Sequence, residues 1–304
     1  MTHAGALALA LLIDALLGEP RWVWDRYPHP AVLMGRAVAA LDRSLNHGEN
    51  RKARGVLALA SLAVPAWVLG GFFAALPFGW LVEIVAAAIL LAQRSLVDHV
   101  RDVANALRIS LGEGRRAVAR IVGRDTAGMD ASAVSRAAIE SAAENFSDGV
   151  IAPAFWFLLL GLPGLLVYKI VNTADSMIGY RTPRYAEFGW ASARFDDLLN
   201  WVPARLTAAL LALAHPSSNA WPVIRRDAGL HRSPNAGWPE AAMAAVLGAA
   251  LSGPRSYHGE VRDYPYVHPE GRRALGPDDI EAAVRVLWRG WLLTFGIVTA
   301  LAIA

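Results

Sequence analysis

The 304-residue sequence contains no cysteine, which excludes disulfide bonds, thiolate nucleophiles and iron–sulfur ligation together. It has no G-x-x-x-x-G-K-[ST] phosphate loop, no G-x-G-x-x-G after a strand and no H-E-x-x-H zinc motif. If a nucleotide is used, side chains and ions must therefore hold its phosphates. The sequence has no lysine-rich run of the kind that binds nucleic acids, and its net charge of +3 comes from scattered arginines. The N-terminus lacks a basic segment and a small-residue cleavage site, so we expect no cleaved signal peptide.

The composition is that of a membrane protein with large water-facing parts. Hydrophobic residues make up 55% of the chain, and the mean hydropathy is +0.34. These values are too apolar for an ordinary soluble domain, whereas 18% charged residues is high for a protein made only of spans. We therefore predict an all-α, polytopic helical membrane protein with a re-entrant segment and sizeable cytoplasmic helical regions.

The apolar and polar segments alternate along one predicted integral membrane domain, residues 1–304. The apolar segments are expected at 4–17, 56–76, 78–92, 150–167, 198–214 and 287–304. The polar segments, expected on the cytoplasmic side, are 18–55, 93–149 and 215–285.

The segment 150–167 is interrupted by Leu162-Pro163-Gly164, and arginines flank it on both sides. The positive-inside tendency places both flanks in the cytoplasm and so favours a re-entrant hairpin. The alternative is a true span followed by an exported basic loop.

Three carboxylates spaced by four residues, Glu140, Glu144 and Asp148, precede this apolar segment. Residues four apart share one helix face, and like charges there destabilise a helix unless a cation compensates them. Arg136, one turn earlier, neutralises only part of this charge, and Mg²⁺ would account for the remainder. The alternative is an ordinary solvated acidic face.

Two further polar clusters flank the apolar segments. Arg94, Asp98, Arg101 and Asn105 form a stripe at helical spacing, which is either part of a site or a structural ladder of ion pairs. Asp14 lies within an apolar helix, where an acid is often functional; the alternative is that it caps a helix or pairs with Arg36.

The last cluster runs from residue 169 to residue 200. Lys169, Asn172 and Ser176 would line one helix face, and basic and acidic side chains follow them. This mixture predicts a pocket for phosphate and metal, although Lys169 and Arg181 could instead anchor the chain at the membrane surface. The predicted members are Lys169, Asn172, Asp175, Arg181, Asp196, Asp197 and Asn200.

Six motifs in order resemble the adenosylcobinamide-phosphate synthase family of cobalamin (vitamin B12) biosynthesis, over nearly the whole chain. They are Leu-Gly-Glu19-Pro20 with Pro28-His29-Pro30, Arg94-Ser-Leu-x-Asp98-His99, Gly123-Arg124-Asp125-Thr126, Glu140-Ser-x-Ala-Glu144-Asn145-x-Ser-Asp148-Gly149, Lys169-x-x-Asn172-Thr-x-Asp175-Ser-Met-Ile-Gly179 and Phe195-Asp196-Asp197…Asn200-x-x-Pro203-Ala-Arg205. Residues after Tyr257 do not align clearly with the family pattern.

The resemblance implies a multi-pass protein of the inner cell membrane whose active site faces the cytoplasm. It implies ATP-dependent joining of adenosylcobyric acid to (R)-1-amino-2-propanol phosphate, with Mg²⁺. Expected partners are these two substrates, the lipid bilayer and no nucleic acid. Assembly as a homo-oligomer, or contact with neighbouring enzymes of the vitamin B12 pathway, is left open.

With this activity, the predicted residues take the following roles. Glu140, Glu144 and Asp148 would hold Mg²⁺, completed by Asp175 or Asp196, while Lys169, Arg94 and Arg181 offset phosphoryl charge. A carboxylate or His99 would accept the ammonium proton. The remaining predicted contacts to the nucleotide and substrates are Asp98, Arg136, Asn145, Asn172, Asp197 and Asn200.

Two other functional classes remain open at this level. A membrane transporter or corrinoid-channelling scaffold without ligase activity would line a path with Asp14, Glu83 and Arg205. A non-catalytic membrane sensor is the third class. Charged positions that concentrate near the cytoplasmic edge, and the lack of an inverted repeat, favour the enzyme.

Overall fold

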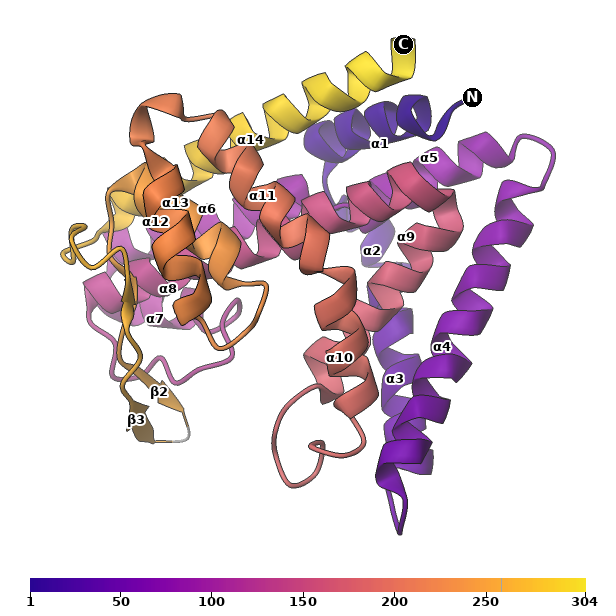
Figure 1. Cartoon of the computed structure of the whole chain (residues 1–304), viewed down its shortest axis with the longest axis horizontal. Helices are drawn as coiled ribbons and strands as arrows, with labels where there is room; N and C mark the ends of the chain where they lie inside the picture. The colour runs from indigo at the N-terminus through magenta and orange to yellow at the C-terminus, as the bar shows by residue number, and fades with distance from the viewer. Residues whose placement is uncertain (258) are drawn as a thin grey trace. The chain divides into compact units, whose positions relative to one another are not determined.

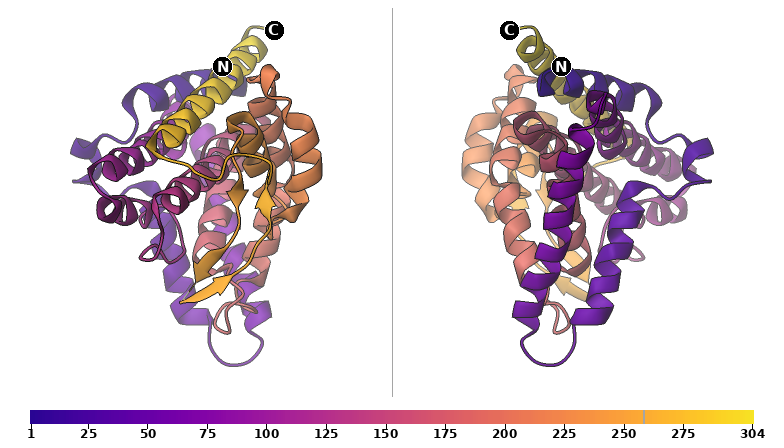
Figure 2. Two further views of the ribbon diagram at one scale, coloured as in Figure 1. Left: turned by 90° about the vertical axis from the view of Figure 1, so that its left-hand side faces the viewer. Right: turned by 90° about the vertical axis from the view of Figure 1, so that its right-hand side faces the viewer.

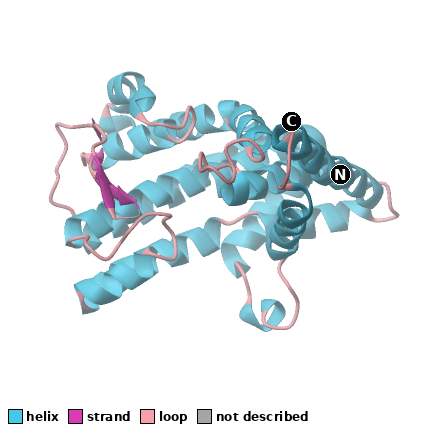
Figure 3. Ribbon diagram, turned by 90° about the horizontal axis from the view of Figure 1, so that it is seen from below, coloured by secondary structure: helices cyan, strands magenta, loops and turns pink. Residues whose placement is uncertain are grey.

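The computed structural model describes residues 1–257 and 259–304, and helices dominate them (Figures 1 and 3). Four helical runs in the described part are long and apolar enough to cross a membrane: Arg51–Ala74, Gly79–Ile109, Ala131–Ile178 and Pro277–Ile303. The predicted all-α polytopic membrane fold is confirmed.

The described chain divides into two compact units built from separate stretches. Unit 1 comprises Met1–Arg94, Asp148–Trp201 and Ile297–Ala304, and unit 2 comprises Ser95–Ser147 and Val202–Gly296. The single domain predicted from the sequence covers both units. The sequence gives no sign that they interleave.

Unit 1 is built on a helical hairpin packed against a long, bent helix. Helices α3 and α4 lie side by side, joined by a short loop (Figure 2), and α4 packs along α9. The helices of unit 1 are α1 (His3–Leu17), α2 (Arg21–Trp24), α3 (Pro30–Leu45), α4 (Arg51–Ala74), α5 (Gly79–Leu90), α9 (Ala152–Ile178) and α10 (Trp190–Leu199).

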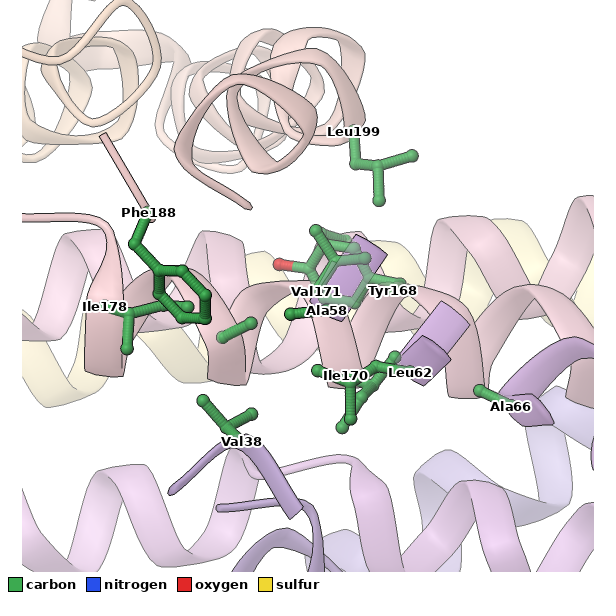
Figure 4. Packing of buried hydrophobic residues seen from close by; sticks show 12 residues of the cluster. Val38, Ala58, Leu62, Ala66, Tyr168, Ile170, Val171, Ile178, Phe188 and Leu199 are labelled. Atoms are coloured by element: carbon green, nitrogen blue, oxygen red, sulfur yellow. The ribbon is translucent and has the colours of Figure 1, made fainter. Parts of the chain in front are cut away.

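Small residues on α4 permit this close packing. A Cβ at Gly70 would lie 2.5 Å from the Cα of Pro163 on α9. A hydrophobic core of unit 1 draws side chains from α3, α4, α9 and α10, and includes Phe188 of the loop before α10 (Figure 4). Large apolar side chains on the other faces of α4, such as Trp67, Val68 and Phe72, are exposed, as expected for a helix that faces lipid.

The predicted interruption of segment 150–167 is present at Gly161, where φ is 64° and α9 changes direction (Figure 1). Glycine reaches this φ without the steric penalty that other residues meet. The Glu83 carboxylate of α5 accepts a hydrogen bond from the Leu162 backbone N–H at 3.4 Å. The only acid in the apolar hairpin 56–92 therefore satisfies a donor freed by the break.

Unit 2 is mainly helical and also contains the strands. Asp130 caps α8, accepting from the Ala133 N–H at 2.7 Å. Val97, Val100 and Ala104 of α6 are buried. The α-helices are α6 (Gln93–Ile109), α7 (Leu111–Val118), α8 (Ala131–Phe146), α11 (Trp201–Leu213), α12 (Ala220–Asp227), α13 (Gly237–Leu247) and α14 (Pro277–Ile303). The first two residues of α6, the first residue of α11 and the end of α14 from Ile297 belong to unit 1.

Two short antiparallel strand pairs lie within the predicted polar region 215–285. Strand β1 (Leu251–Ser252) pairs with β4 (Tyr266–Val267), and β2 (Arg255–Tyr257) pairs with β3 (Glu260–Arg262). Strands this short carry little periodic signal, so the sequence pattern does not reveal them.

We expect Gly70→Ala to destabilise the protein, because the added Cβ meets the backbone of Pro163 and the two helices must separate. Overpacking of this kind costs about 1–3 kcal/mol. The matched control is Gly71→Ala, where no atom lies within 4 Å of the added Cβ. Thermal unfolding in detergent should show a lower Tm for the first variant only. Equal Tm values would contradict the packing of α4 on α9.

Candidate functional site

Unit 1 contains a buried hydrogen-bond network between α9 and α10. The Asp196 carboxylate accepts from Asn172 Nδ2 at 3.2 Å and from Asn200 Nδ2 at 3.0 Å. The Tyr168 hydroxyl lies 3.0 Å from both Asn200 Oδ1 and the Asp148 carbonyl oxygen. Three of the predicted site residues, Asn172, Asp196 and Asn200, are thus brought together.

Asp175 completes this group as a second carboxylate near Asp196. Burial, followed by the negative charge of Asp175, raises the pKa of Asp196 to about 7, against the hydrogen bonds from Asn172 and Asn200. A Cβ at Gly179 would lie 1.9 Å from Asp175 Oδ1, so the glycine makes room for the carboxylate. Repulsion between two neighbouring carboxylates disfavours ionisation of one of them. A divalent cation bound by both would offset that repulsion.

A more exposed set of charges borders the pair. Arg194 lies 3.7 Å from Asp197. Burial raises the pKa of Asp197, and the charges of Arg194 and Arg181 oppose that rise. Arg181 and Asp197, both predicted from the sequence, therefore belong to the same region as Asp196.

The N-terminal motif reaches a second part of unit 1. The buried Asp14 carboxylate accepts from the Gln93 backbone N–H at 2.9 Å, so it caps the start of α6 and does not pair with Arg36. Gly18, with φ of 59°, leaves room for the Arg94 side chain, whose Cγ would lie 2.7 Å from an added Cβ. Arg94 is thereby placed beside the Gly18-Glu19 turn.

Lys169 connects these two parts. It interacts electrostatically with Asp148 and with Glu19. Asp148 also offers its carbonyl oxygen to Tyr168, which belongs to the Asp196 network. Five of the six motifs therefore contribute to one polar region of unit 1.

The predicted trio Glu140, Glu144 and Asp148, here called the α8 edge, does not stay together as one group. Glu140 is buried in unit 2, and its oxygens accept from the Ser252 N–H at 2.7 Å and from Arg124 and Arg255 at 2.5 and 3.2 Å. Glu144 interacts electrostatically with Glu140, as the spacing predicts, but its side chain is exposed. Asp148 lies in the π-helix Ser147–Ile151, where the period of 3.6 residues does not hold.

The charge compensation expected at this edge comes from other residues. Arg136 does not pair with the carboxylates: it donates to the carbonyl oxygens of Ala250 and Arg273 at 3.3 and 3.2 Å. Asn145 is exposed and donates to the Ser141 carbonyl at 2.8 Å. Arg124 and Arg255 therefore compensate the charge of Glu140, for which we expected a metal ion from the sequence.

A buried acid missed by the sequence analysis lies beside Glu140. Burial, followed by Glu140 and then Glu144, raises the pKa of Glu240 to about 8, against Arg255 and Arg124. Its Oε1 lies 3.6 Å from Arg255 Nη2.

His231 faces the same carboxyl group of Glu240, with Nε2 3.8 Å from Oε2. Burial lowers the pKa of His231 to about 4, and the charges of Arg255 and Arg232 act in the same direction. At neutral pH the pair is therefore an uncharged acid beside an uncharged imidazole.

The α6 stripe is largely structural. Arg101 lies 3.8 Å from Asp98 and 3.6 Å from Glu281 on α14, which is the ladder of ion pairs left open above. His99 is exposed, with Nδ1 2.7 Å from the Ser95 carbonyl. The roles predicted for Asp98 and His99 stay predictions.

Within the described residues, no three His, Cys, Asp or Glu side chains are placed to hold one metal ion. Mg²⁺ is usually bound by one or two carboxylates together with phosphate oxygens and water. The Asp175–Asp196 pair fits that requirement, whereas Glu140 is already engaged by two arginines.

Sequence reasoning missed Tyr168, Arg255, His231 and Glu240 as members of these networks. Glu240 did carry a signal, because it is the single charge in the apolar run from Trp238 to Leu251. A lone acid in such a run is expensive to bury unless it is neutral or paired. The other three carried no comparable signal, since their partners are remote in sequence.

Comparison with known proteins gives a consistent match. A family model described as "CobD/Cbib protein" matches residues 7–287. The chain is 51% identical over 312 residues to "Cobalamin biosynthesis protein CobD" of Rhizobium meliloti (strain 1021), covering 97% of this chain and 95% of the relative. A protein of the same description from Rhodobacter capsulatus is 45% identical, with 99% of each chain covered. No solved structure matches the chain.

Glu240→Gln should flatten the pH dependence of stability. The pKa of Glu240 is raised to about 8 in the folded state, so the unfolded chain loses this proton near the ordinary pKa of 4.5 and the folded protein only near pH 8. Folding stability therefore falls as pH rises from about 4.5 to about 8, and the variant removes that loss.

Urea or thermal unfolding at pH 5.5 and 8 would measure this effect. The wild type should lose more stability than the variant between the two values, by at least about 1 kcal/mol. Glu260→Gln is the control, because that side chain is 76% exposed. Parallel pH profiles for wild type and Glu240→Gln would contradict the buried, protonated state.

Proposed function

Because the chain belongs to the CobD/Cbib family, whose relatives are described as cobalamin biosynthesis proteins, we propose that it is the amide ligase of that pathway. It joins the propionate carboxylate of adenosylcobyric acid to the amine of (R)-1-amino-2-propanol phosphate at the expense of ATP. The observation that carries this proposal is the polar region of unit 1, where paired acids, carboxamides and cations from five motifs lie beside apolar helices.

The reaction requires activation of a carboxylate. A carboxylate oxygen is a poor leaving group, so the γ-phosphoryl group of ATP is transferred to it, giving an acyl phosphate and ADP. The amine then attacks the acyl carbon, and inorganic phosphate leaves. No covalent bond to the protein is required, which agrees with the lack of cysteine.

Asp175 and Asp196 are the residues best suited to hold Mg²⁺. When bound, the ion neutralises phosphate charge and orients the phosphoryl oxygens. Asn172 and Asn200 each donate to one oxygen of Asp196 and so fix its orientation. The trio predicted from the sequence, Glu140, Glu144 and Asp148, is the competing assignment.

Cations of unit 1 would stabilise the phosphoryl groups of ATP and of the amine substrate. Lys169 and Arg94 both lie beside the Gly18-Glu19 turn, and Arg181 lies beside Asp197. Preorganised cations of this kind lower the barrier because they need no rearrangement as charge develops.

The amine must lose a proton before it attacks. Asp148 and Glu19, the acids that interact with Lys169, are suited to accept that proton. His99 is the alternative acceptor predicted from the sequence.

The charges at the start of α4 support a cytoplasmic site. Arg51, Lys52 and Arg54 precede its apolar stretch, and the positive-inside tendency places such residues in the cytoplasm. Arg51 donates to the carbonyl oxygens of Pro183 and Arg184, in the loop that carries Arg181. The site would then open to the compartment that contains ATP.

A transporter or channelling scaffold is less well supported. It would need Asp14, Glu83 and Arg205 along a path. Asp14 instead caps α6, Glu83 accepts from the Leu162 N–H, and Arg205 donates to Asn235 and stacks on the Trp238 ring.

The direct test uses membranes that contain this chain, supplied with adenosylcobyric acid, aminopropanol phosphate, ATP and Mg²⁺. Mass spectrometry should detect the amide product, adenosylcobinamide phosphate, only when ATP is present. Uptake of corrinoid into proteoliposomes without product would favour transport instead.

Two carboxamide variants distinguish the metal assignments. We expect Asp196→Asn to lower kcat about 100-fold or to raise the Mg²⁺ concentration for half-maximal rate, since one ligand charge is lost. Glu144→Gln should then leave the Mg²⁺ dependence unchanged. The reverse pattern would assign the ion to the α8 edge.

Lys169→Ala should raise KM for ATP or for aminopropanol phosphate about 10-fold or more, because a charge-assisted contact to a phosphoryl group is lost. Steady-state kinetics with each substrate varied separately will show which phosphoryl group is bound. Unchanged kinetics for both would remove Lys169 from the site.

A further inference from the structure

The loop of residues 179–189, here called the Arg181 loop, joins α9 to α10 and contains neither helix nor strand. Arg181 is exposed on this loop and interacts electrostatically with Asp197, the residue next to Asp196. Loops generally move more than the elements they connect, unless their backbone is held. If Arg181 is to bind a phosphoryl group, the loop that carries it must be held in place.

The anchor is a buried carboxylate on α3. Asp42 accepts hydrogen bonds from Arg184 Nη2 at 2.7 Å, from the Tyr185 hydroxyl at 3.3 Å and from Asn46 Nδ2 at 2.8 Å. Two of these donors belong to the Arg181 loop, three and four residues after Arg181. The Asp42 side chain is only 10% exposed, so this acceptor is held in the packed interior of unit 1, whereas the Arg184 side chain that reaches it from the loop is 62% exposed.

Helix α4 also contacts the backbone of the Arg181 loop. Arg51 Nη1 lies 3.3 and 3.4 Å from the carbonyl oxygens of Pro183 and Arg184. Phe188 is fully buried, and a Cβ at Gly55 would lie 1.9 Å from the Phe188 carbonyl oxygen. The loop is therefore tied at its middle by Asp42 and Arg51 and at its end by Phe188.

We propose that Asp42 is a positioning residue that, through Arg184 and Tyr185, fixes the Arg181 loop so that Arg181 meets a substrate phosphoryl group beside Asp196. The proposal rests on the proposed function for the identity of the substrate. The phosphoryl group comes from ATP or from aminopropanol phosphate, since both substrates present the same chemistry to a guanidinium group. Asp42 lies in none of the sequence motifs described above.

The physical consequence is a change in the fraction of protein that is competent to bind. If the loop is released, only part of the population presents Arg181 correctly, and the apparent affinity falls by that fraction. Once the phosphoryl group is bound, the reacting groups are unchanged. Loss of Asp42 should therefore raise KM and leave kcat nearly constant.

The test compares purified, full-length Asp42→Asn with wild type. We expect KM for one phosphorylated substrate to rise about 10-fold while kcat changes by less than about 2-fold. Trypsin should cleave after Arg181 or Arg184 about 10-fold faster, because cleavage follows loop opening. Arg184→Lys, which keeps the positive charge facing Asp42, should lie between wild type and Asp42→Asn in both measurements.

The matched control is Glu187→Gln. Glu187 lies in the same loop and pairs with Arg51 at 3.5 Å, but its side chain is 58% exposed. Exposed pairs contribute little, so KM and cleavage rate should equal those of wild type.

Two results would overturn the proposal. One is unchanged cleavage in Asp42→Asn, which would show that Asp42 does not hold the loop. The other is faster cleavage with KM unchanged for both substrates, which would show that the held loop does not position Arg181. The substrate whose KM rises identifies the source of the phosphoryl group.

Failure of the proposed function would be recognised separately, as wild-type protein that forms no amide. The proposal is then decided by protection from trypsin. ATP or aminopropanol phosphate should slow cleavage of the Arg181 loop in wild type but not in Asp42→Asn, whereas lack of protection in wild type would overturn the proposal.

Discussion

Backbone N–H groups that are freed where an apolar helix breaks or begins must find acceptors inside the protein, since lipid offers none. Two acids of unit 1, one buried and one half-buried, meet this requirement. Asp14 accepts from the Gln93 N–H at the start of α6, and Glu83 accepts from the Leu162 N–H after the break at Gly161. Acids that the sequence shows as isolated charges in apolar segments thus hold the interrupted helices in place.

The interruptions allow polar side chains to gather beside apolar helices. Tyr168, in the second half of the bent helix, links the Asp148 carbonyl to Asn200 and thereby to Asp196. A continuous span in place of α9 would carry these groups through the membrane, where each would need a partner. The bend, the side-chain amides that donate to Asp196 and the proximity of Asp175 together make a region suited to a phosphate-bearing substrate and a divalent cation.

Unit 2 accommodates its buried acids in a different way. Glu140 is buried but surrounded by arginines and a backbone donor, whereas Glu240 is buried with a pKa near 8 and so stays protonated at neutral pH. Removing a charge and pairing it are the two ways in which a protein interior accommodates an acid. Both occur here between neighbouring side chains.

The sequence was informative wherever the signal was local. The apolar segments predicted α1, α4 and α5 within a few residues, and Leu162-Pro163-Gly164 marked the bend. Within the candidate site, Asn172, Asp196 and Asn200 were named from spacing and from family resemblance, and the structure brings them together.

Properties that depend on remote partners could not be obtained in this way. The spacing of Glu140 and Glu144 placed them correctly on one helix face, but their charges are compensated by Arg124, Arg232 and Arg255, from different segments. The sequence by itself therefore determined the helical membrane class, the main elements and the residues that carry charge. Only the tertiary structure decided which acids are paired, which stay neutral and which face one another, because electrostatic energy depends on distance and burial, and neither is encoded in local spacing.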